Sequence, residues 1–128
     1  MRLLLDTHAF LWWITADAKL SKTAQTVLSD PKTIPVLSAA SGWEIAIKYA
    51  IGKLPLPEAP SVYIPAHIVR NGVVELAITM DHALHTHTLP LHHRDPFDRM
   101  LVAQSQLEDI PIITSDLLIS QYSVPIVW

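Results

Sequence analysis

The sequence contains no cysteine, no long hydrophobic run and no excess of positive charge. The absence of cysteine excludes a disulfide scaffold and a thiolate metal site, and it fits a reducing compartment. Apolar runs such as residues 9–14 are far shorter than the roughly 20 residues of a membrane-spanning helix, and no basic signal-peptide segment opens the chain. We therefore expect a soluble, cytoplasmic protein with no membrane partner.

The net charge of −3 argues against a broadly basic nucleic-acid-binding surface, but it says little about one local cleft. The chain has 128 residues, and half of them are hydrophobic, which is enough for one domain with its own core. No fixed-period repeat or low-complexity tract divides it, and residues 54–60, LPLPEAP, read as a loop. We expect residues 1–128 to form a single domain.

Short apolar segments alternate along the chain with segments of helical pattern. The segments expected to form strands are residues 2–5, 34–37, 73–77, 110–114 and 124–127. The segments expected to form helices are residues 8–16, 21–29, 41–51, 61–71, 81–87 and 96–109. This alternation is typical of an α/β fold, in which helices cover both faces of a mainly parallel sheet, here of about five strands.

Four acidic residues are expected at one edge of this sheet. Asp6 directly follows the first strand, and Asp116 follows the apolar run IIT of residues 112–114. Ligands of such sheets bind beyond the carboxyl ends of the strands, so both acids lie where a ligand would bind.

The other two acids lie in helices that meet the same edge. Ser41 and Glu44 have the spacing of a capping box, which places Glu44 in the first turn of the helix after the second strand. In the segment RDPFD, we expect Asp95 to be the N-cap of a helix and Asp98 to be the third residue of that helix. We therefore expect Glu44 and Asp98 to converge with the strand-end acids.

Four carboxylates in one pocket repel one another unless a cation compensates them. Mg²⁺ or Mn²⁺ suits such a site because both prefer hard oxygen ligands, and either supports phosphoryl hydrolysis. Each acid alone also has a structural explanation: Glu44 as a capping residue or an ion-pair partner of Lys48, Asp98 as a first-turn acid, and Asp95 as a cap. The convergence of four acids favours the metal site.

Taken together, the segments LLLDTH, SGWEIAIK, HRDPFDRMLVAQ and ITSD resemble the PIN-domain ribonucleases of the VapC toxin type. The resemblance implies an α/β/α sandwich and an endoribonuclease that depends on Mg²⁺ or Mn²⁺. It also implies a homodimer, or a larger toxin–antitoxin assembly, whose RNA-cleaving site a cognate antitoxin occludes. The acidic positions of the family fall on Asp6, Glu44, Asp98 and Asp116. Thr114 matches a hydroxyl position that supports the last acid, and Asp95 is an ambiguous extra acid.

Other side chains allow two interpretations. Arg94, Arg99, Lys48 and Lys53 lie near the acidic motifs and are candidates for binding RNA phosphates, or they form a solvated rim. Five histidines do not have the spacing of a dedicated zinc or nickel site, so we expect them on a solvated loop and helix face. They are His82, His85, His87, His92 and His93.

The helix that follows Asp6 is more apolar than one buried face requires. Phe10, Trp13 and Ile14 form a stripe that we expect to face the core. Leu11 and Trp12 would then point partly outward, which suggests a partner interface, unless the helix is packed on both sides within the monomer.

Two rival functions come from outside the nuclease class. A receiver-like metal-binding module also gathers acids at strand ends, but it needs an acidic pair after the first strand and a lysine after the last. This chain has Asp6 alone there and no lysine beyond Lys53. A catalytically silent PIN-like interaction module is the other alternative, and the presence of all four acids argues against it.

Overall fold

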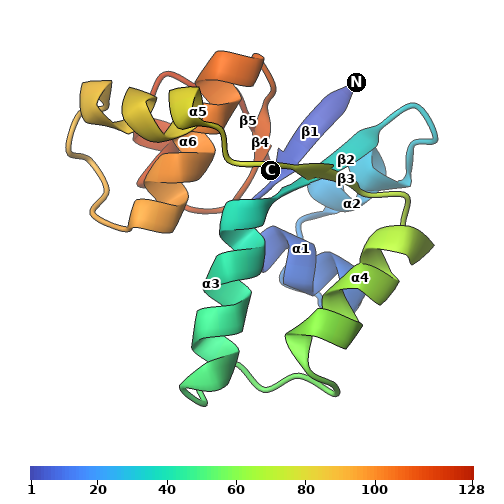
Figure 1. The fold of residues 1–128 in the computed structure, drawn as a ribbon. Coiled ribbons are helices and arrows are strands. Elements are labelled where there is room, and N and C mark those ends of the chain that lie inside the picture. The colour runs from blue at the N-terminus through green and yellow to red at the C-terminus, as the bar shows by residue number, and fades with distance from the viewer.

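The computed structural model describes residues 1–128 and is built on a five-stranded, fully parallel sheet of order β3-β2-β1-β4-β5 (Figure 1). The strands are β1 (Arg2–Leu5), β2 (Ile34–Ser38), β3 (Val74–Leu76), β4 (Ile112–Ile113) and β5 (Ile126–Val127). All five predicted strands are present. The last three are shorter than predicted, because apolar residues beside them pack in the core without pairing.

Six α-helices connect the strands, as the alternation predicts. They are α1 (Thr7–Ile14), α2 (Lys22–Ser29), α3 (Ala39–Ala50), α4 (Pro60–Arg70), α5 (Met80–His85) and α6 (Pro96–Glu108). Two short 3₁₀ helices, η1 (Thr86–Thr88) and η2 (Ile119–Gln121), were not predicted. None of the helices is both long and apolar enough to span a membrane.

Two hydrophobic cores lie on opposite faces of the sheet. Leu3 and Leu5 of β1 pack in one core with residues of α1, α2 and α4, whereas Leu4 packs in the other with residues of α6. Figure 1 shows α5 and α6 on one side of the strands and α2 and α4 on the other. The expected α/β/α sandwich is therefore confirmed.

The apolar run of β1 follows from its central position. Leu3, Leu4 and Leu5 have no exposed surface, because β2 and β4 flank the strand and helices cover both faces. Burying one such side chain contributes about 1.5–3 kcal/mol relative to leaving it in water. The strand thus anchors both cores and holds rigid the residue that follows it.

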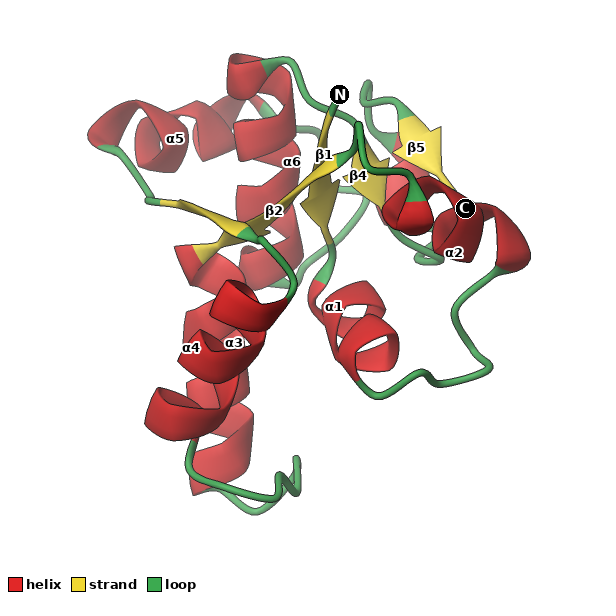
Figure 2. Cartoon of the chain, turned by 90° about the vertical axis from the view of Figure 1, so that its right-hand side faces the viewer, coloured by secondary structure: helices red, strands yellow, loops and turns green.

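The strand order reverses at β1. The chain adds β2 and β3 on one side of β1, and then returns to add β4 and β5 on the other side (Figure 2). The carboxyl ends of β1 and β4 therefore meet at a topological switch point, the usual place of a ligand in open α/β sheets. Asp6 and Asp116 both follow strands that end there.

The predicted capping box of Ser41 and Glu44 is wrong. Helix α3 begins at Ala39, directly after β2, and its N-cap is Ser38, whose hydroxyl accepts a hydrogen bond from the Ala40 N–H at 3.0 Å. The Ser41 hydroxyl accepts instead from the hydroxyl of Thr7 at 2.9 Å. Glu44 consequently lies in the second turn of α3 and not in the first.

Candidate active site

Asp6 is the first acid of the site, and it is also the N-cap of α1. The residue is 6% exposed, and its Oδ1 atom accepts a hydrogen bond from the His8 N–H at 2.8 Å. Oδ2 accepts from the hydroxyl of Thr114. Burial raises the pKa of Asp6, although these two hydrogen bonds and the charge of His8 oppose the shift and the charge of Asp116 adds to it.

Thr114 links the two acids that follow β1 and β4. Its hydroxyl donates to the Asp6 carboxylate and accepts from the backbone N–H of Asp116 at 3.0 Å. The Asp116 Oδ1 atom accepts from the Leu118 N–H at 2.8 Å. Thr114 thus contacts both acids, which is consistent with a supporting role.

Glu44 approaches the site from α3 and is 3% exposed. Its Oε2 atom accepts from Lys48 Nζ at 2.6 Å, so the ion pair expected from the spacing is present. The other oxygen, Oε1, is buried and has no hydrogen-bond partner. An unpartnered carboxylate oxygen in a buried position costs free energy, which points to a missing ligand.

Asp98 is the third residue of α6, after Asp95 at the N-cap and Pro96, as predicted. Asp95 Oδ1 accepts from the N–H groups of Phe97 at 2.8 Å and Asp98 at 3.3 Å. Burial, together with the negative charges of Asp95, Asp6 and Glu44, raises the pKa of Asp98 to about 7. The predicted acids are therefore close enough for the negative charge of one to raise the pKa of another.

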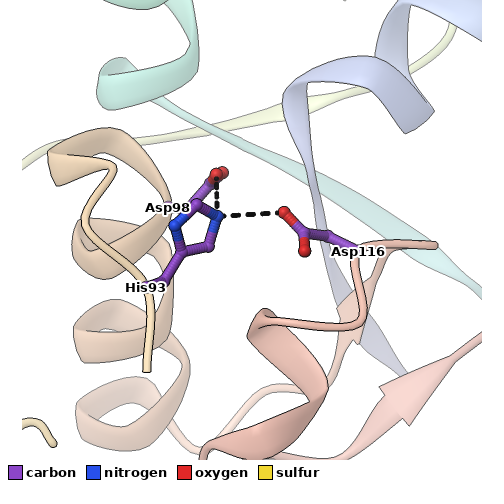
Figure 3. Close-up of side chains that lie close together, drawn as sticks. All are labelled: His93, Asp98 and Asp116. Carbon is purple, nitrogen blue, oxygen red and sulfur yellow. Dashed lines mark hydrogen bonds and ion pairs between the residues drawn. The ribbon is translucent and has the colours of Figure 1, made fainter. Parts of the chain in front are cut away.

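His93 completes the group, and the sequence analysis did not assign it to the site. Its Nε2 atom lies 2.9 Å from Asp98 Oδ2 and 3.1 Å from Asp116 Oδ2, between the two carboxylates (Figure 3). His93 is 14% exposed, so it does not lie on a solvated face as expected. Its place two residues before Asp95 is the one signal in the sequence that points to the site.

The donor set of the site fits a hard divalent cation. One ligand atom each of His93, Asp98 and Asp116 lies within 4.8 Å of the others. Glu44 Oε1 lacks a partner, and burial raises the pKa of both Asp6 and Asp98. Carboxylate oxygens are the ligands that Mg²⁺ and Mn²⁺ prefer, so the acids of this site suit either ion.

Comparison with known proteins decides the family. The family model described as the PIN domain matches residues 3–124, which is nearly the whole chain. This chain belongs to the PIN-domain family. The family placement agrees with the strand-end acids and with the sandwich fold described above.

Relatives of this PIN domain include VapC proteins. A stretch of 61 residues is 41% identical to Ribonuclease VapC16 of Mycobacterium tuberculosis and covers 48% of this chain and 43% of that relative. The fold resembles VapBC2 from Rickettsia felis, solved bound to a DNA fragment from their promoter, with a TM-score of 0.70, 11% identity, and coverage of 98% and 97% of the two chains. It also resembles VapBC-1 from nontypeable Haemophilus influenzae, with a TM-score of 0.64, 21% identity, and coverage of 94% and 91%.

The four basic residues near the acidic motifs differ in their hydrogen bonds and in their exposure to solvent. The Arg99 guanidinium donates to four backbone carbonyls within residues 86–93 and to the Tyr122 hydroxyl, so its hydrogen bonds are directed into the chain. Lys48 contacts Glu44, and this hydrogen bond raises the pKa of Lys48. Arg94 and Lys53 are exposed. Arg99 is thus placed to hold the segment before α6.

The apolar helix α1 borders a groove of the PIN domain. Phe10 is fully buried as predicted, whereas Trp13 and Ile14 are half-buried, like Leu11 and Trp12. The expected contrast between an inner and an outer face is therefore weaker than predicted. Leu11, Trp12, His8, Tyr63 and residues 54–57 line a groove of about 250 Å³.

The remaining histidines are not all solvated either. His82 is 3% exposed, and its Nε2 atom lies 3.3 Å from Glu108 Oε1. It also forms a capping box with Thr79 at the start of α5. The expectation of a solvated face is therefore wrong for His82 as well as for His93, because each ring is largely buried and contacts polar groups of other elements.

Proposed function

We propose that this PIN domain is an endoribonuclease that depends on Mg²⁺ or Mn²⁺ and acts as the toxin of a toxin–antitoxin pair. The observation that carries the proposal is a group of buried and half-buried carboxylates at the switch point, in which Glu44 Oε1 has no partner and the pKa of Asp98 is raised to about 7. The similarity to Ribonuclease VapC16 supports RNA as the substrate. Action on cellular RNA would place the protein in the cytoplasm.

Asp6, Glu44, Asp98 and Asp116 would hold the ion. A bound divalent ion would supply an activated water for attack at phosphorus and would neutralise charge on the phosphate. The chain orients the acids in advance, because the His8 N–H and the Thr114 hydroxyl hold Asp6. Lys48 holds one oxygen of Glu44 and leaves the other free.

Cleavage of single-stranded RNA by the purified protein, free of antitoxin, tests this proposal. We expect cleavage in Mg²⁺ or Mn²⁺, loss of cleavage in EDTA, and products with a 5′-phosphate and a 3′-hydroxyl. Cyclic phosphate ends would contradict the metal-dependent mechanism. A protein that binds Mn²⁺ and cuts no RNA would be the silent interaction module.

The RNA contacts are a further part of the proposal. Arg94 is exposed and directly precedes Asp95, so it is well placed to meet a phosphate at the site. Lys48 is half-buried, and the charges of Asp95 and Asp98 act on it as well as that of Glu44. Arg99 supports the site from within, because its guanidinium is engaged by backbone carbonyls.

We also propose that an antitoxin segment occupies the groove beside α1. His8, which lines this groove, is two residues from Asp6, so a peptide in the groove reaches the acidic site. Its apolar residues would pack on Leu11 and Trp12, and a basic side chain would meet the carboxylates. A toxin–antitoxin complex from Klebsiella pneumoniae has a similar fold, with a TM-score of 0.57, 15% identity, and coverage of 89% and 86% of the two chains.

A homodimer completes the proposal, within a larger toxin–antitoxin assembly. Helix α3 and its C-cap residue expose Trp43, Ile47 and Ile51, at 61%, 38% and 59%, with a spacing of four residues that places them on one stripe. Such an apolar stripe suits a second copy of the chain. Analytical ultracentrifugation should show a wild-type dimer and an Ile47→Glu monomer, with exposed Val69→Glu as the control. A wild-type monomer would contradict the homodimer.

A further inference from the structure

The backbone of His93 is held on both sides. Its N–H donates to the Tyr122 hydroxyl at 2.9 Å, and its carbonyl accepts from Arg99 Nη1 at 3.4 Å. Tyr122 is itself buried, and Arg99 donates to its hydroxyl at 3.1 Å. Both backbone groups of His93, three residues before the start of α6, are therefore held by Tyr122 and Arg99.

The ring of His93 is held in one tautomer. The backbone N–H of Asp95 donates to Nδ1 at 3.2 Å, so this nitrogen presents its lone pair and carries no proton. The proton of the neutral ring is then on Nε2, the nitrogen that faces Asp98 and Asp116 (Figure 3). The ring offers the two carboxylates a donor and not a lone pair.

We propose that His93 is a positioning residue that donates its Nε2 proton to Asp116 and contacts Asp98 through the same nitrogen, and that it is not a ligand of the metal. The inference rests on the proposed function, because it assigns these acids to a divalent ion. Asp98 lies in α6 and Asp116 follows β4, and their negative charges repel each other. The ring lies between the two carboxylates, so its hydrogen bond holds Asp116 Oδ2 and its contact restrains Asp98 Oδ2.

The alternative, in which Nε2 binds the ion, conflicts with the same contacts. A ligating Nε2 must lose its proton, which then resides on Nδ1. Nδ1–H would face the N–H of Asp95, so two donors would oppose each other. Mg²⁺ also prefers oxygen to imidazole nitrogen. Orientation of ligating carboxylates by hydrogen bonds from neighbouring residues is a general feature of metal sites.

The first test measures Mn²⁺ affinity by the electron spin resonance signal of the free ion. His93→Leu should weaken Mn²⁺ binding by about 10- to 100-fold, the usual loss when a residue that orients a ligand is removed. His93→Gln, whose amide retains a donor, should recover most of the affinity. The matched control is His87→Leu, since His87 is exposed, and it should bind Mn²⁺ as the wild type does. Unchanged affinity in His93→Leu would overturn the proposal.

The second test reads the ring directly and needs no variant. Nitrogen-15 spectra of the histidine rings should show His93 with its proton on Nε2, both without metal and with Mg²⁺ bound. Electron spin echo spectra of the Mn²⁺-loaded protein should show no directly bound nitrogen. A proton on Nδ1, or a nitrogen ligand, would make His93 a ligand and overturn the proposal.

Tyr122→Phe offers a milder perturbation should His93→Leu fail to fold. It removes the hydroxyl that holds the His93 backbone and should lower Mn²⁺ affinity in the same direction by a smaller factor. If the wild type binds Mn²⁺, His93→Leu binds it more weakly, and the wild type cuts no RNA, the proposed endoribonuclease function is refuted but the role of His93 is not. RNA cleavage with Mn²⁺ affinity independent of His93 would refute the histidine's role alone. Absence of Mn²⁺ binding in the wild type would refute both.

Discussion

The interior of the sheet and the residues that directly follow its central strands are both buried but opposite in chemistry. Leu5 at the end of β1 has no exposed surface, and the next residue, Asp6, is only 6% exposed. Ile113 at the end of β4 is likewise buried and is followed by Thr114, which is 1% exposed. The interior stabilises the fold by apolar burial, whereas the edge buries charge at a cost in stability. The acidic edge is thus held in place by the strands behind it.

The sharpest contrast should come from Leu4→Ala in the interior. The side chain has no exposed surface, so its removal leaves a cavity and should lower the free energy of unfolding by about 3–4 kcal/mol. Urea unfolding measures the change. Leu117→Ala, at a residue 79% exposed, is the control and should change stability by less than about 0.5 kcal/mol. A loss below about 1 kcal/mol for Leu4→Ala would show that β1 does not anchor the cores.

Asp98→Asn should have the opposite effect at the edge. RNA cleavage should fall at least about 100-fold, because a proposed metal ligand is lost. The metal-free variant should be more stable than the wild type at pH 8 by about 1–2 kcal/mol, since a repelled buried charge is gone.

Asp81→Asn is the matched control, because Asp81 is also a first-turn acid, in α5, and is exposed. It should cut RNA and unfold as the wild type does. Loss of stability in metal-free Asp98→Asn would break the contrast between interior and edge.

Trp12→Ala tests whether the groove beside α1 serves a partner and not the site itself. Antitoxin affinity should weaken by about 1–3 kcal/mol, the usual loss at an aromatic anchor, while RNA cleavage by the free protein stays nearly unchanged. Fluorescence titration with the antitoxin measures the affinity. Val69→Ala, at a residue 82% exposed on α4, is the control. Unchanged affinity in Trp12→Ala would assign this side chain to the core or to the dimer contact.

The edge should also make stability depend on pH in the metal-free protein. The pKa of Asp98 is raised from 3.8 to about 7, so the folded state keeps a proton that the unfolded chain has released. The free energy of unfolding should therefore fall by about 2–3 kcal/mol as the pH rises from 5 to 8. The difference between wild type and Asp98→Asn isolates this group from other titrating residues. If the free energy of unfolding changed with pH in the same way in wild type and Asp98→Asn, the raised pKa of Asp98 would be contradicted.

The sequence was sufficient to predict the layers and the place of the acids. Continuous apolar runs such as Leu3–Leu5 indicate buried parallel strands, and the strand-end rule then predicts the position of Asp6 and Asp116. Asp95 and Pro96 have strong local preferences at helix starts, so their positions in α6 were also predicted correctly.

Local sequence patterns gave wrong or missing predictions for residues whose positions depend on tertiary contacts. Ser41 has the spacing of a cap, but β2 leads directly into α3, and the Ser41 hydroxyl bonds with Thr7 from another element. The only sequence signal for His93 is its place two residues before Asp95, and this does not fix its orientation, which depends on Tyr122 and on the path of residues 86–93. A side chain that is positioned by distant partners cannot be inferred from its neighbours in the sequence.

The central claim is that the acids at the carboxyl edge of β1 and β4 bind a divalent cation, and calorimetric titration of Mn²⁺ into the metal-free protein tests it most directly. The account predicts saturable binding by the wild type, and binding at least about tenfold weaker in Asp98→Asn. Mg²⁺ should compete with Mn²⁺ for the same site. A wild type that binds neither ion, or an Asp98→Asn variant that binds Mn²⁺ as tightly as the wild type, would contradict the claim.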